Sequence, residues 1–259
     1  MTGTADPTAR FSDRAQLYAR WRPGYPAEAF DFVVRAAGLA PGARVADLGA
    51  GTGISSQPWL ARGFEVAAVE PNEPMRRVAE AGLGADPRFR AVDGTAEATG
   101  LDDAGVELAF AAQAFHWFDR ARARAEIARV LRPGGNLALL WNDREKDATP
   151  FDRGYEDLLL AHGTDYRDVD HTRIGDDEIA AFYAPGVPVR AAFPHRHEVD
   201  REGLVGRVVS CSYVPGPGEP GHQALVAAVE RLFDEHARGG RVALSYRTRV
   251  WLGPLPRRG

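Results

Sequence analysis

Cysteine and lysine are almost missing from this chain of 259 residues. Cys211 is its single cysteine, which excludes an intramolecular disulfide and a cysteine-based metal cluster. Lys146 is its single lysine, and acidic residues offset the arginines along the whole chain, so that the formal net charge is −4. This balance gives no electrostatic reason to expect a nucleic acid as the main partner. We attribute the preference for arginine to a GC-rich genome.

Long hydrophobic stretches are also missing. No run reaches the roughly 18 consecutive apolar residues of a membrane-spanning helix, and residues 1–10 lack the apolar centre of a signal peptide. Hydrophobic residues make up 44% and charged residues 26% of the chain, as is usual for a globular protein with a packed core. We therefore expect a cytoplasmic protein without a membrane partner.

Strand-like and helix-like patterns alternate from residue 41 onward. Apolar runs predict strands at residues 44–48, 65–69, 89–92, 106–111 and 136–141, and amphipathic segments predict helices at residues 55–61, 73–81 and 120–131. This alternation indicates βαβ units and a mostly parallel sheet. The runs LAFAA and LALLW are nearly continuous in apolar residues, as in strands buried on both faces.

The segments on either side of this core are expected to cover it. Residues 1–40 are predicted to form an N-terminal lid, with helices at 12–21 and 27–37, and residues 41–148 the ligand-binding core. Residues 149–240 are predicted to form a cap insertion, with a strand at 189–199 and helices at 201–212 and 223–237. Residues 241–259 are predicted to form the last strand and a tail. We expect all of these to form a single domain, given the length of the chain.

The strongest local signal is the glycine-rich loop VADLGAGTG at residues 45–53. Gly49, Gly51 and Gly53 follow a predicted strand, where a ligand can approach the backbone closely, unless they serve only helix–sheet packing. The dinucleotide fingerprint places its third glycine or alanine where this chain has Ile54. Glu70 closes the next strand and can accept hydrogen bonds from both hydroxyls of a ribose. The loop and Glu70 together predict a nucleoside site.

Further motifs follow in a fixed order: VAAVEPNEPM (66–75), DGTAEATGL (93–101), AAQAFHWFD (111–119) and LRPGGNLALLW (131–141). With the glycine loop they resemble the class I S-adenosylmethionine-dependent methyltransferases, type 11 branch. The opening FSDRAQLYARWRPGYP (11–26) is similar to the lid of bacterial small-molecule members, such as trans-aconitate methyltransferase-like proteins. The resemblance implies an α/β fold with a Rossmann-like sheet of seven strands, mostly parallel, and helices on both faces.

The resemblance also implies which residues bind S-adenosylmethionine, with S-adenosylhomocysteine as product. The glycines would pass close to the methionine part, and Asp47 would help to fix its amino group. Glu70 would bind the ribose, and Gln113 would lie beside the sulfonium. The implied cofactor-binding set is Asp47, Gly49, Ala50, Gly51, Gly53, Glu70, Asn72, Met75, Thr95, Ala96, Glu97, Ala112 and Gln113. Ala50 departs from relatives, which often have cysteine, but it keeps the loop small.

Methyl transfer requires an aligned nucleophile and the exclusion of water. A base is needed only where the acceptor keeps its proton until the transition state, and His116 in FHWFD is our candidate for it. His116 is also interpreted as a wall of the ligand pocket, because histidines beside aromatic residues are often structural. Of Phe115 and Trp117, we expect one to line an acceptor pocket and the other to pack against the following helix.

The acceptor is predicted to be a small molecule, either a carboxylic acid or a natural-product intermediate. The implied substrate-binding residues are Tyr18, Arg22, Tyr25, His116, Trp117, Arg207 and Tyr213. Arg22 or Arg207 can grip a carboxylate with two parallel hydrogen bonds. The same arrangement would suit an acceptor methylated on oxygen, nitrogen or carbon.

Two polar clusters are interpreted as solvent-exposed faces. His195 and His197 alternate in FPHRHEVD and, with Asp200, contain no third ligand at metal-binding spacing, so we expect no metal. Arg120, Arg122 and Arg124 are similarly expected to point into solvent around one helix.

Two other functions are compatible with part of the sequence. A nicotinamide-dependent oxidoreductase shares the glycine loop and the ribose-binding acid, but Ile54 and the lack of a Tyr-x-x-x-Lys pair argue against it. A non-catalytic module that only binds the cofactor or a partner is opposed by the presence of the glycine loop, Glu70 and the segment after the fourth strand together.

Overall fold

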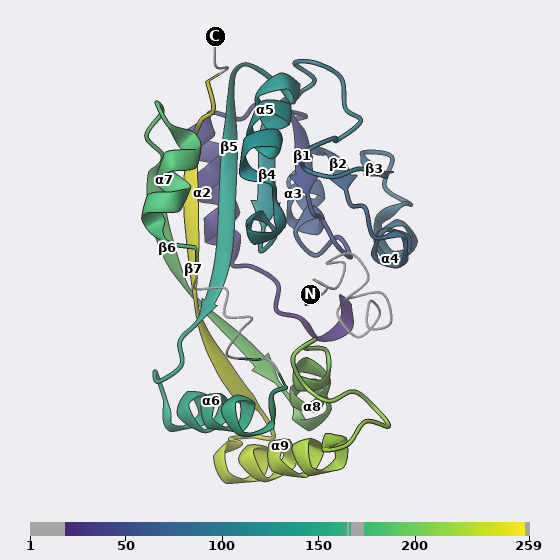
Figure 1. The fold of residues 1–259 in the computed structure, drawn as a ribbon, viewed down its shortest axis with the longest axis vertical. Coiled ribbons are helices and arrows are strands. Elements are labelled where there is room, and N and C mark those ends of the chain that lie inside the picture. Colours follow the sequence, from purple (N-terminus) through teal and green to yellow (C-terminus); the bar gives the residue numbers. More distant parts are fainter. Residues whose placement is uncertain (1–18, 165, 167–173, 257–259) are drawn as a thin grey trace, which may run out of the picture.

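A seven-stranded sheet runs through the molecule in the order β3-β2-β1-β4-β5-β7-β6 (Figure 1). The computed structural model describes residues 19–164, 166 and 174–256. The strands are β1 (Arg44–Leu48), β2 (Glu65–Val69), β3 (Phe89–Val92), β4 (Val106–Ala112), β5 (Leu131–Arg144), β6 (Val189–Val199) and β7 (Val242–Pro254). Strands β1 to β5 pair in parallel, and β7 is antiparallel to both β5 and β6. The predicted Rossmann-like, mostly parallel sheet of seven strands is confirmed.

Helices cover both faces of the sheet. They are α2 (Ala27–Ala37), α3 (Ser56–Ala61), α4 (Glu73–Leu83), η2 (Phe115–Trp117), α5 (Arg120–Val130), α6 (Pro150–His162), α7 (Asp176–Tyr183), α8 (Arg201–Val209) and α9 (His222–His236). Residues of α5 and α7, such as Ile127 and Phe182, pack on one face, and residues of α2 and α3, such as Phe30 and Trp59, pack on the other. Helix α2, which the sequence assigned to the lid, therefore belongs to the core, because its apolar side needs the sheet to cover it.

Helices α6, α8 and α9 lie beyond the end of the parallel strands (Figure 1), and their buried residues form a second apolar core. Strand β5 leaves β7 at the Arg144–Tyr246 pair, whereas β6 and β7 continue together to the Val199–Val242 pair. Helices α6, α8 and α9 pack around this extension. We call these three helices, together with residues 166, 195–199, 210–221 and 242–246, the lower lobe. Its buried residues include Tyr155, Leu204, Leu225 and Leu244. The segment predicted as a cap insertion thus also supplies the edge strand β6.

The sequence predicted that Arg120, Arg122 and Arg124 point into solvent, but only Arg122 is exposed. Arg120 is partly buried and Arg124 is buried, and both connect α5 to neighbouring segments of the chain. Arg124 is 6% exposed and donates to the carbonyl oxygens of Phe182, Ala184 and Pro256 at 2.9, 2.8 and 3.2 Å. Arg120 lies over the Phe115 ring and pairs with Glu178 of α7. Carbonyls near the end of α7 thus stabilise the charge of Arg124, whereas Arg120 donates to the carbonyls of Phe115 and Phe118. The spacing of the arginines could not reveal these partners.

His195 and His197 also differ from the expected solvated face. Both are partly buried, because their side of β6 faces the chain at Trp21 and Gly24 and the buried Arg207. Burial lowers the pKa of His197 to about 4, with a further contribution from the charge of Arg207. Both imidazoles are therefore neutral near pH 7.

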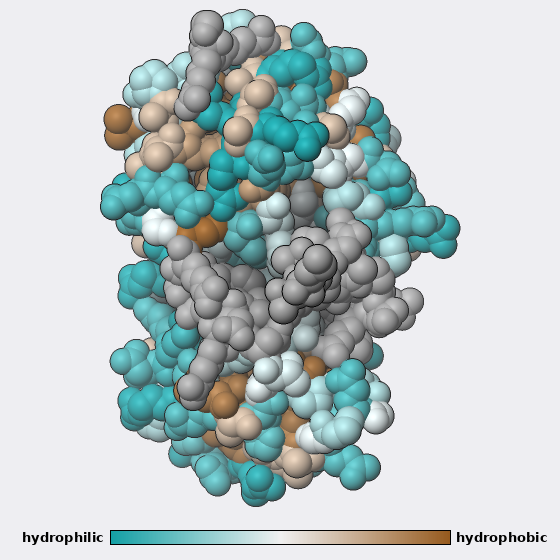
Figure 2. Space-filling view, viewed as in Figure 1, coloured by the Kyte–Doolittle hydropathy of each residue, from teal (hydrophilic) through white to brown (hydrophobic). Residues whose placement is uncertain are grey.

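A helix that spans a membrane must be both long and apolar. In the face shown by Figure 2, hydrophilic residues dominate the described part, and hydrophobic residues form small separate groups. Within residues 19–164, 166 and 174–256, no helix is both long and apolar enough to cross a bilayer.

Candidate functional site

A cavity of about 360 Å³ opens at the carboxyl ends of β1, β2 and β4 and reaches into the lower lobe. Its volume is within the range of ligand pockets, roughly 300–1,000 Å³. The carboxyl edge is where open α/β sheets bind ligands, since the loops that follow parallel strands meet there. The glycine loop, the segment after β2, the segment after β4 and the end of β5 all contribute to its wall.

The three glycines of the loop have left-handed backbone conformations, with φ of 67°, 57° and 84° at Gly49, Gly51 and Gly53. Their surroundings differ. A Cβ atom on Gly49 would lie 2.6 Å from the Cβ of Ala114, and one on Gly53 would lie 2.7 Å from a methyl group of Leu83. Gly51 has only the sulfur of Met75 nearby, at 3.6 Å from an added Cβ. Gly49 and Gly51 line the cavity, whereas Gly53 serves packing against α4.

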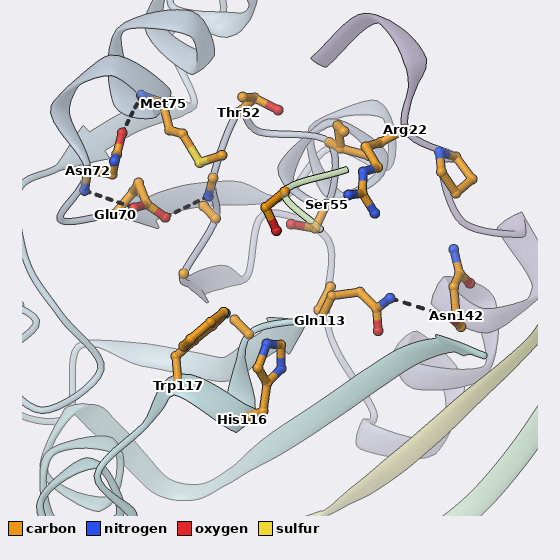
Figure 3. Close-up of a pocket in the computed structure, with 18 of the residues that line it drawn as sticks. Arg22, Thr52, Ser55, Glu70, Asn72, Met75, Gln113, His116, Trp117 and Asn142 are labelled. Atoms are coloured by element: carbon orange, nitrogen blue, oxygen red, sulfur yellow. Dashed lines mark hydrogen bonds between the residues drawn. The ribbon is translucent and has the colours of Figure 1, made fainter. Parts of the chain in front are cut away.

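Glu70 joins the loop to the next segment of the wall (Figure 3). One carboxylate oxygen accepts from the backbone N–H of Gly51 at 2.9 Å, and the other accepts from the N–H of Asn72 at 2.8 Å. Burial raises the pKa of Glu70, although the two hydrogen bonds oppose this shift. A carboxylate has about four acceptor positions, so two remain for hydroxyl groups of a ligand.

Asp47 lies beneath the loop rather than in the cavity wall. It is fully buried, and one of its oxygens accepts from the hydroxyls of Ser55 and Ser56, both at 2.7 Å. Burial raises its pKa to about 6, with a smaller increase from the charge of Glu70 and a decrease from the serine hydrogen bonds. Asp47 therefore fixes the start of α3 and adds negative potential below the loop.

Gln113 follows β4 with φ of 56°, a conformation that is uncommon for residues other than glycine. Its backbone N–H donates to the carbonyl of Leu140 at 2.9 Å, and its side-chain amide donates to the carbonyl of Asn142. The side-chain oxygen is buried without a hydrogen-bond partner among the described residues. Strained backbone and unused polar atoms are typical of binding sites.

The aromatic segment after β4 divides its side chains between core and cavity. Phe115 is fully buried against Trp141 and Phe182, while Trp117 lines the cavity and is 40% exposed. Its ring centroid lies 4.6 Å from that of His116, which also lines the cavity (Figure 3). Of these two aromatic residues, Trp117 therefore lies at the cavity and Phe115 lies in the core.

The opposite end of the cavity is basic. Arg22 and Tyr25 reach it from the N-terminal segment, and Arg207 and Tyr213 from the lower lobe. Residues that the sequence did not single out join them: Asn142, Asp143, Arg144, Lys146, Tyr166 and Tyr246. Residues 142–146 follow LALLW and lie at the carboxyl end of β5, at the same edge of the sheet as the other loops. The rule that ligands bind at the carboxyl ends of parallel strands could have identified them from the sequence. Tyr166 and Tyr246 arrive from the lower lobe and gave no signal in the sequence.

The structure thus brings most of the predicted site residues together. The members of the predicted set that line the cavity are Arg22, Tyr25, Gly49, Ala50, Gly51, Glu70, Asn72, Met75, Thr95, Ala96, Glu97, Ala112, Gln113, His116, Trp117, Arg207 and Tyr213. Asp47 and Gly53 stand behind the wall, and Tyr18 lies outside the described residues. In the part of the chain that the structure describes, no three His, Cys, Asp or Glu side chains gather as metal ligands.

The sequence also resembles known proteins. Residues 46–139, which include β1 to β4 and much of β5, match the model of a methyltransferase domain family. An uncharacterized methyltransferase of Mycobacterium tuberculosis is 46% identical over 141 residues, 54% of this chain and 55% of that protein. A malonyl-[acyl-carrier protein] O-methyltransferase of Methylococcus capsulatus is 43% identical over 101 residues, 38% of this chain and 37% of that protein. The chain therefore spans about half the length, or less, of these curated relatives.

Solved structures share the fold over most of the chain. A protein of Anaeromyxobacter dehalogenans, described provisionally as a type II methyltransferase, is 27% identical and has a TM-score of 0.68, covering 92% of this chain and 99% of that one. The YcgJ protein of Bacillus subtilis, at 19% identity and a TM-score of 0.56, shares the fold alone. The lower lobe is thus included in the likeness to the first structure, whereas the family model ends at residue 139.

Proposed function

We propose that this chain is an S-adenosylmethionine-dependent methyltransferase that acts on a small-molecule acceptor. The observation that carries the proposal is Glu70, which ties Gly51 to Asn72 at the cavity wall and keeps acceptor positions for a ribose diol. The match of residues 46–139 to a methyltransferase domain supports the same conclusion.

The residues at this end of the cavity fit the cofactor chemically. S-adenosylmethionine carries a sulfonium and an ammonium, and Glu70, Glu97 and the buried Asp47 make this end acidic. The side-chain oxygens of Gln113 and Thr52 are buried without hydrogen-bond partners in the described part of the chain, and both residues line the cavity. A nicotinamide dinucleotide would instead bring an anionic pyrophosphate to these acids, which disfavours the oxidoreductase.

The bound cofactor would supply an electrophilic methyl group, and the residues of the chain would orient it and exclude water from it. Gly49 and Gly51 let the ligand approach the backbone, and Gln113 limits where the sulfonium end can lie. Trp117 and Tyr25 cover the reacting region with apolar surface and so exclude water. His116 lies in the same wall and can accept a proton from an acceptor hydroxyl.

The binding test is calorimetry with S-adenosylmethionine and S-adenosylhomocysteine on the wild type and on Gly51→Asp. We expect the variant to lose about a hundredfold or more in affinity, because its side chain fills the approach to the backbone and places a second carboxylate beside Glu70. Gly42→Asp is the matched control, since Gly42 has φ of 75° and nothing within 4 Å of an added Cβ.

Turnover is tested separately, by release of S-adenosylhomocysteine from a panel of small-molecule acceptors. Absence of binding for either cofactor form in the wild type would contradict the proposal. Tight binding with no turnover on any acceptor would favour the non-catalytic binding module.

A further inference from the structure

Arg207 of α8 is a buried cation at the basic end of the cavity. It is 5% exposed and lines the cavity wall. Among the described residues, no carboxylate lies within ion-pair distance of its guanidinium, which remains charged at any physiological pH. A buried charge is costly unless an opposite charge or a full set of hydrogen bonds compensates for it.

The hydrogen bonds of Arg207 leave it incompletely compensated. One terminal nitrogen donates to the sulfur of Cys211 at 2.9 Å, and the other donates to the hydroxyl of Tyr246 at 3.4 Å. Its Nε is buried and has no hydrogen-bond partner in the described part of the chain. Arg124 offers a direct comparison, because it is equally buried but donates to three carbonyl oxygens and does not line this cavity.

The charges around the cavity are separated by sign. Glu70 and Glu97 lie at the glycine-loop end, while Arg22, Arg144, Lys146 and Arg207 lie at the other end. Arg144 and Lys146 share Glu156 as their ion-pair partner, and Asp143 is paired with Arg249. The Nη1 of Arg144 is a second buried donor without a hydrogen-bond partner among the described residues. Arg207 itself has no carboxylate within ion-pair distance among the described residues.

We propose that Arg207 binds a carboxylate group of the methyl acceptor, so that the substrate is a small organic acid; this inference rests on the proposed function. A carboxylate carries one negative charge and takes up two parallel N–H bonds from a guanidinium. A phosphate monoester carries about two negative charges, more than the guanidinium of Arg207 alone would balance. The hydroxyl of Tyr246, in the same wall, accepts from Arg207 and can donate its own proton to the same anion.

Cys211 is the other group that could balance this charge. It is fully buried and does not line the cavity. Burial alone would raise the pKa of its thiol, but the guanidiniums of Arg207 and Arg22 outweigh this effect, and the pKa is lowered. Exchange of Cys211 for serine therefore separates a thiolate partner within the protein from an acid bound in the cavity.

The experiment compares acetate, benzoate and phenylacetate with their primary amides, as ligands of the wild type with S-adenosylhomocysteine bound. Binding is followed by the ¹H–¹⁵N signal of the Arg207 side-chain Nε, assigned by its loss in Arg207→Lys. We expect at least one acid to bind about tenfold more tightly than its amide and to shift this signal. No preference for any acid over its amide, or a preference with an unmoved Nε signal, would overturn the inference.

Variants then test the residue itself. In Arg207→Gln the preference for the acid should fall by about tenfold, while S-adenosylhomocysteine affinity stays within about threefold. Arg201→Gln is the matched control, because Arg201 is exposed on the same helix and paired with Asp234. If Arg207→Gln does not fold, Tyr246→Phe replaces it, with an expected severalfold loss of the preference.

Cys211→Ser should leave the preference within about threefold. A gain of about tenfold in acid affinity in this variant would identify the thiolate as the native counter-charge and overturn the inference. Failure of the proposed function would appear differently, as loss of S-adenosylhomocysteine binding in the wild type. In that case the acids and their amides are compared without S-adenosylhomocysteine, because their binding at Arg207 does not depend on turnover.

Discussion

At the scale of single residues, Asp47 is an acid held away from water under the glycine loop. Its pKa rises from 3.8 to about 6 because burial disfavours the charged form. The folded state therefore binds the proton more tightly than the unfolded state does. This contribution favours folding fully below pH 3.8 and is lost as the pH rises to about 6, with no further change above that value.

Replacement of Asp47 by asparagine should reveal this effect as a difference between two pH values. The shift in pKa from 3.8 to about 6 corresponds to on the order of 3 kcal/mol. The difference in unfolding free energy, variant minus wild type, should therefore be larger at about pH 8 than at about pH 4 by about this amount. Urea denaturation of both proteins at each pH measures it. The cost of burying the asparagine amide is present at both pH values and cancels. An equal difference at both would show that Asp47 does not titrate in this window.

For other residues, the role in the structure depends on neighbouring residues that the local sequence does not reveal. Gly49, Gly51 and Gly53 look alike in the sequence, yet Gly53 packs against α4 while Gly51 faces the cavity. Arg124 and Arg207 are both arginines on helices, yet one is satisfied by carbonyls and the other lines the cavity. Residue type and spacing predicted the loop, and packing assigned the separate roles.

At the scale of elements, α8 is held closely against the segment that enters the cavity from the N-terminal side. A Cβ atom on Gly206 would overlap the indole ring of Trp21. Arg20 pairs with Glu202 of the same helix at 2.9 Å. Arg22, which follows Trp21 directly, lines the cavity. A glycine in the middle of a helix here permits a contact between two elements at some cost in helix propensity.

Gly206→Ala should displace the indole of Trp21 and loosen this contact, although alanine favours the helix itself by about 1 kcal/mol. We expect trypsin to cleave after Arg20 several times faster in the variant, as followed by mass spectrometry over time. Gly82→Ala in α4 is the matched control, because nothing lies within 4 Å of an added Cβ there. Unchanged cleavage after Arg20 would show that the contact with Gly206 does not hold this segment.

At the scale of the whole molecule, the cavity draws its two ends from two separate apolar cores. The sheet core carries the glycine loop and Glu70, and the lower lobe carries Arg207, Tyr213 and Tyr246. A destabilising substitution in the lower lobe should therefore affect acceptor binding more than cofactor binding. The long β6–β7 pair connects the two parts (Figure 1).

Leu225→Ala tests this division, because Leu225 is fully buried in the lower lobe and does not line the cavity. We expect a loss of about 2–5 kcal/mol in unfolding free energy, measured by urea denaturation, from lost burial and the cavity left behind. S-adenosylhomocysteine affinity should stay within about threefold in calorimetry. Leu160→Ala, at a position 40% exposed, is the control for a leucine outside the core. A tenfold loss of cofactor affinity at full folding would contradict the division.

The order of strands and helices was determined by the sequence alone. Strands β1, β2, β3 and β6 and helix α2 have the predicted bounds, because apolar periodicity and glycine turns act over a few residues. The glycine loop and Glu70 likewise meet at the carboxyl edge, since consecutive parallel strands must end there.

Only the tertiary structure decided how the second half of the chain completes the cavity. Strand β7 inserts between β5 and β6, and its extension with β6 lets α6, α8 and α9 build a separate core. Arg207, Tyr213 and Tyr246 thereby reach a cavity whose glycine loop and Glu70 lie more than a hundred residues earlier in the chain. Local patterns carry no information on such distant contacts, and burial, which determines the charge balance at Asp47 and Arg207, exists only once they have formed.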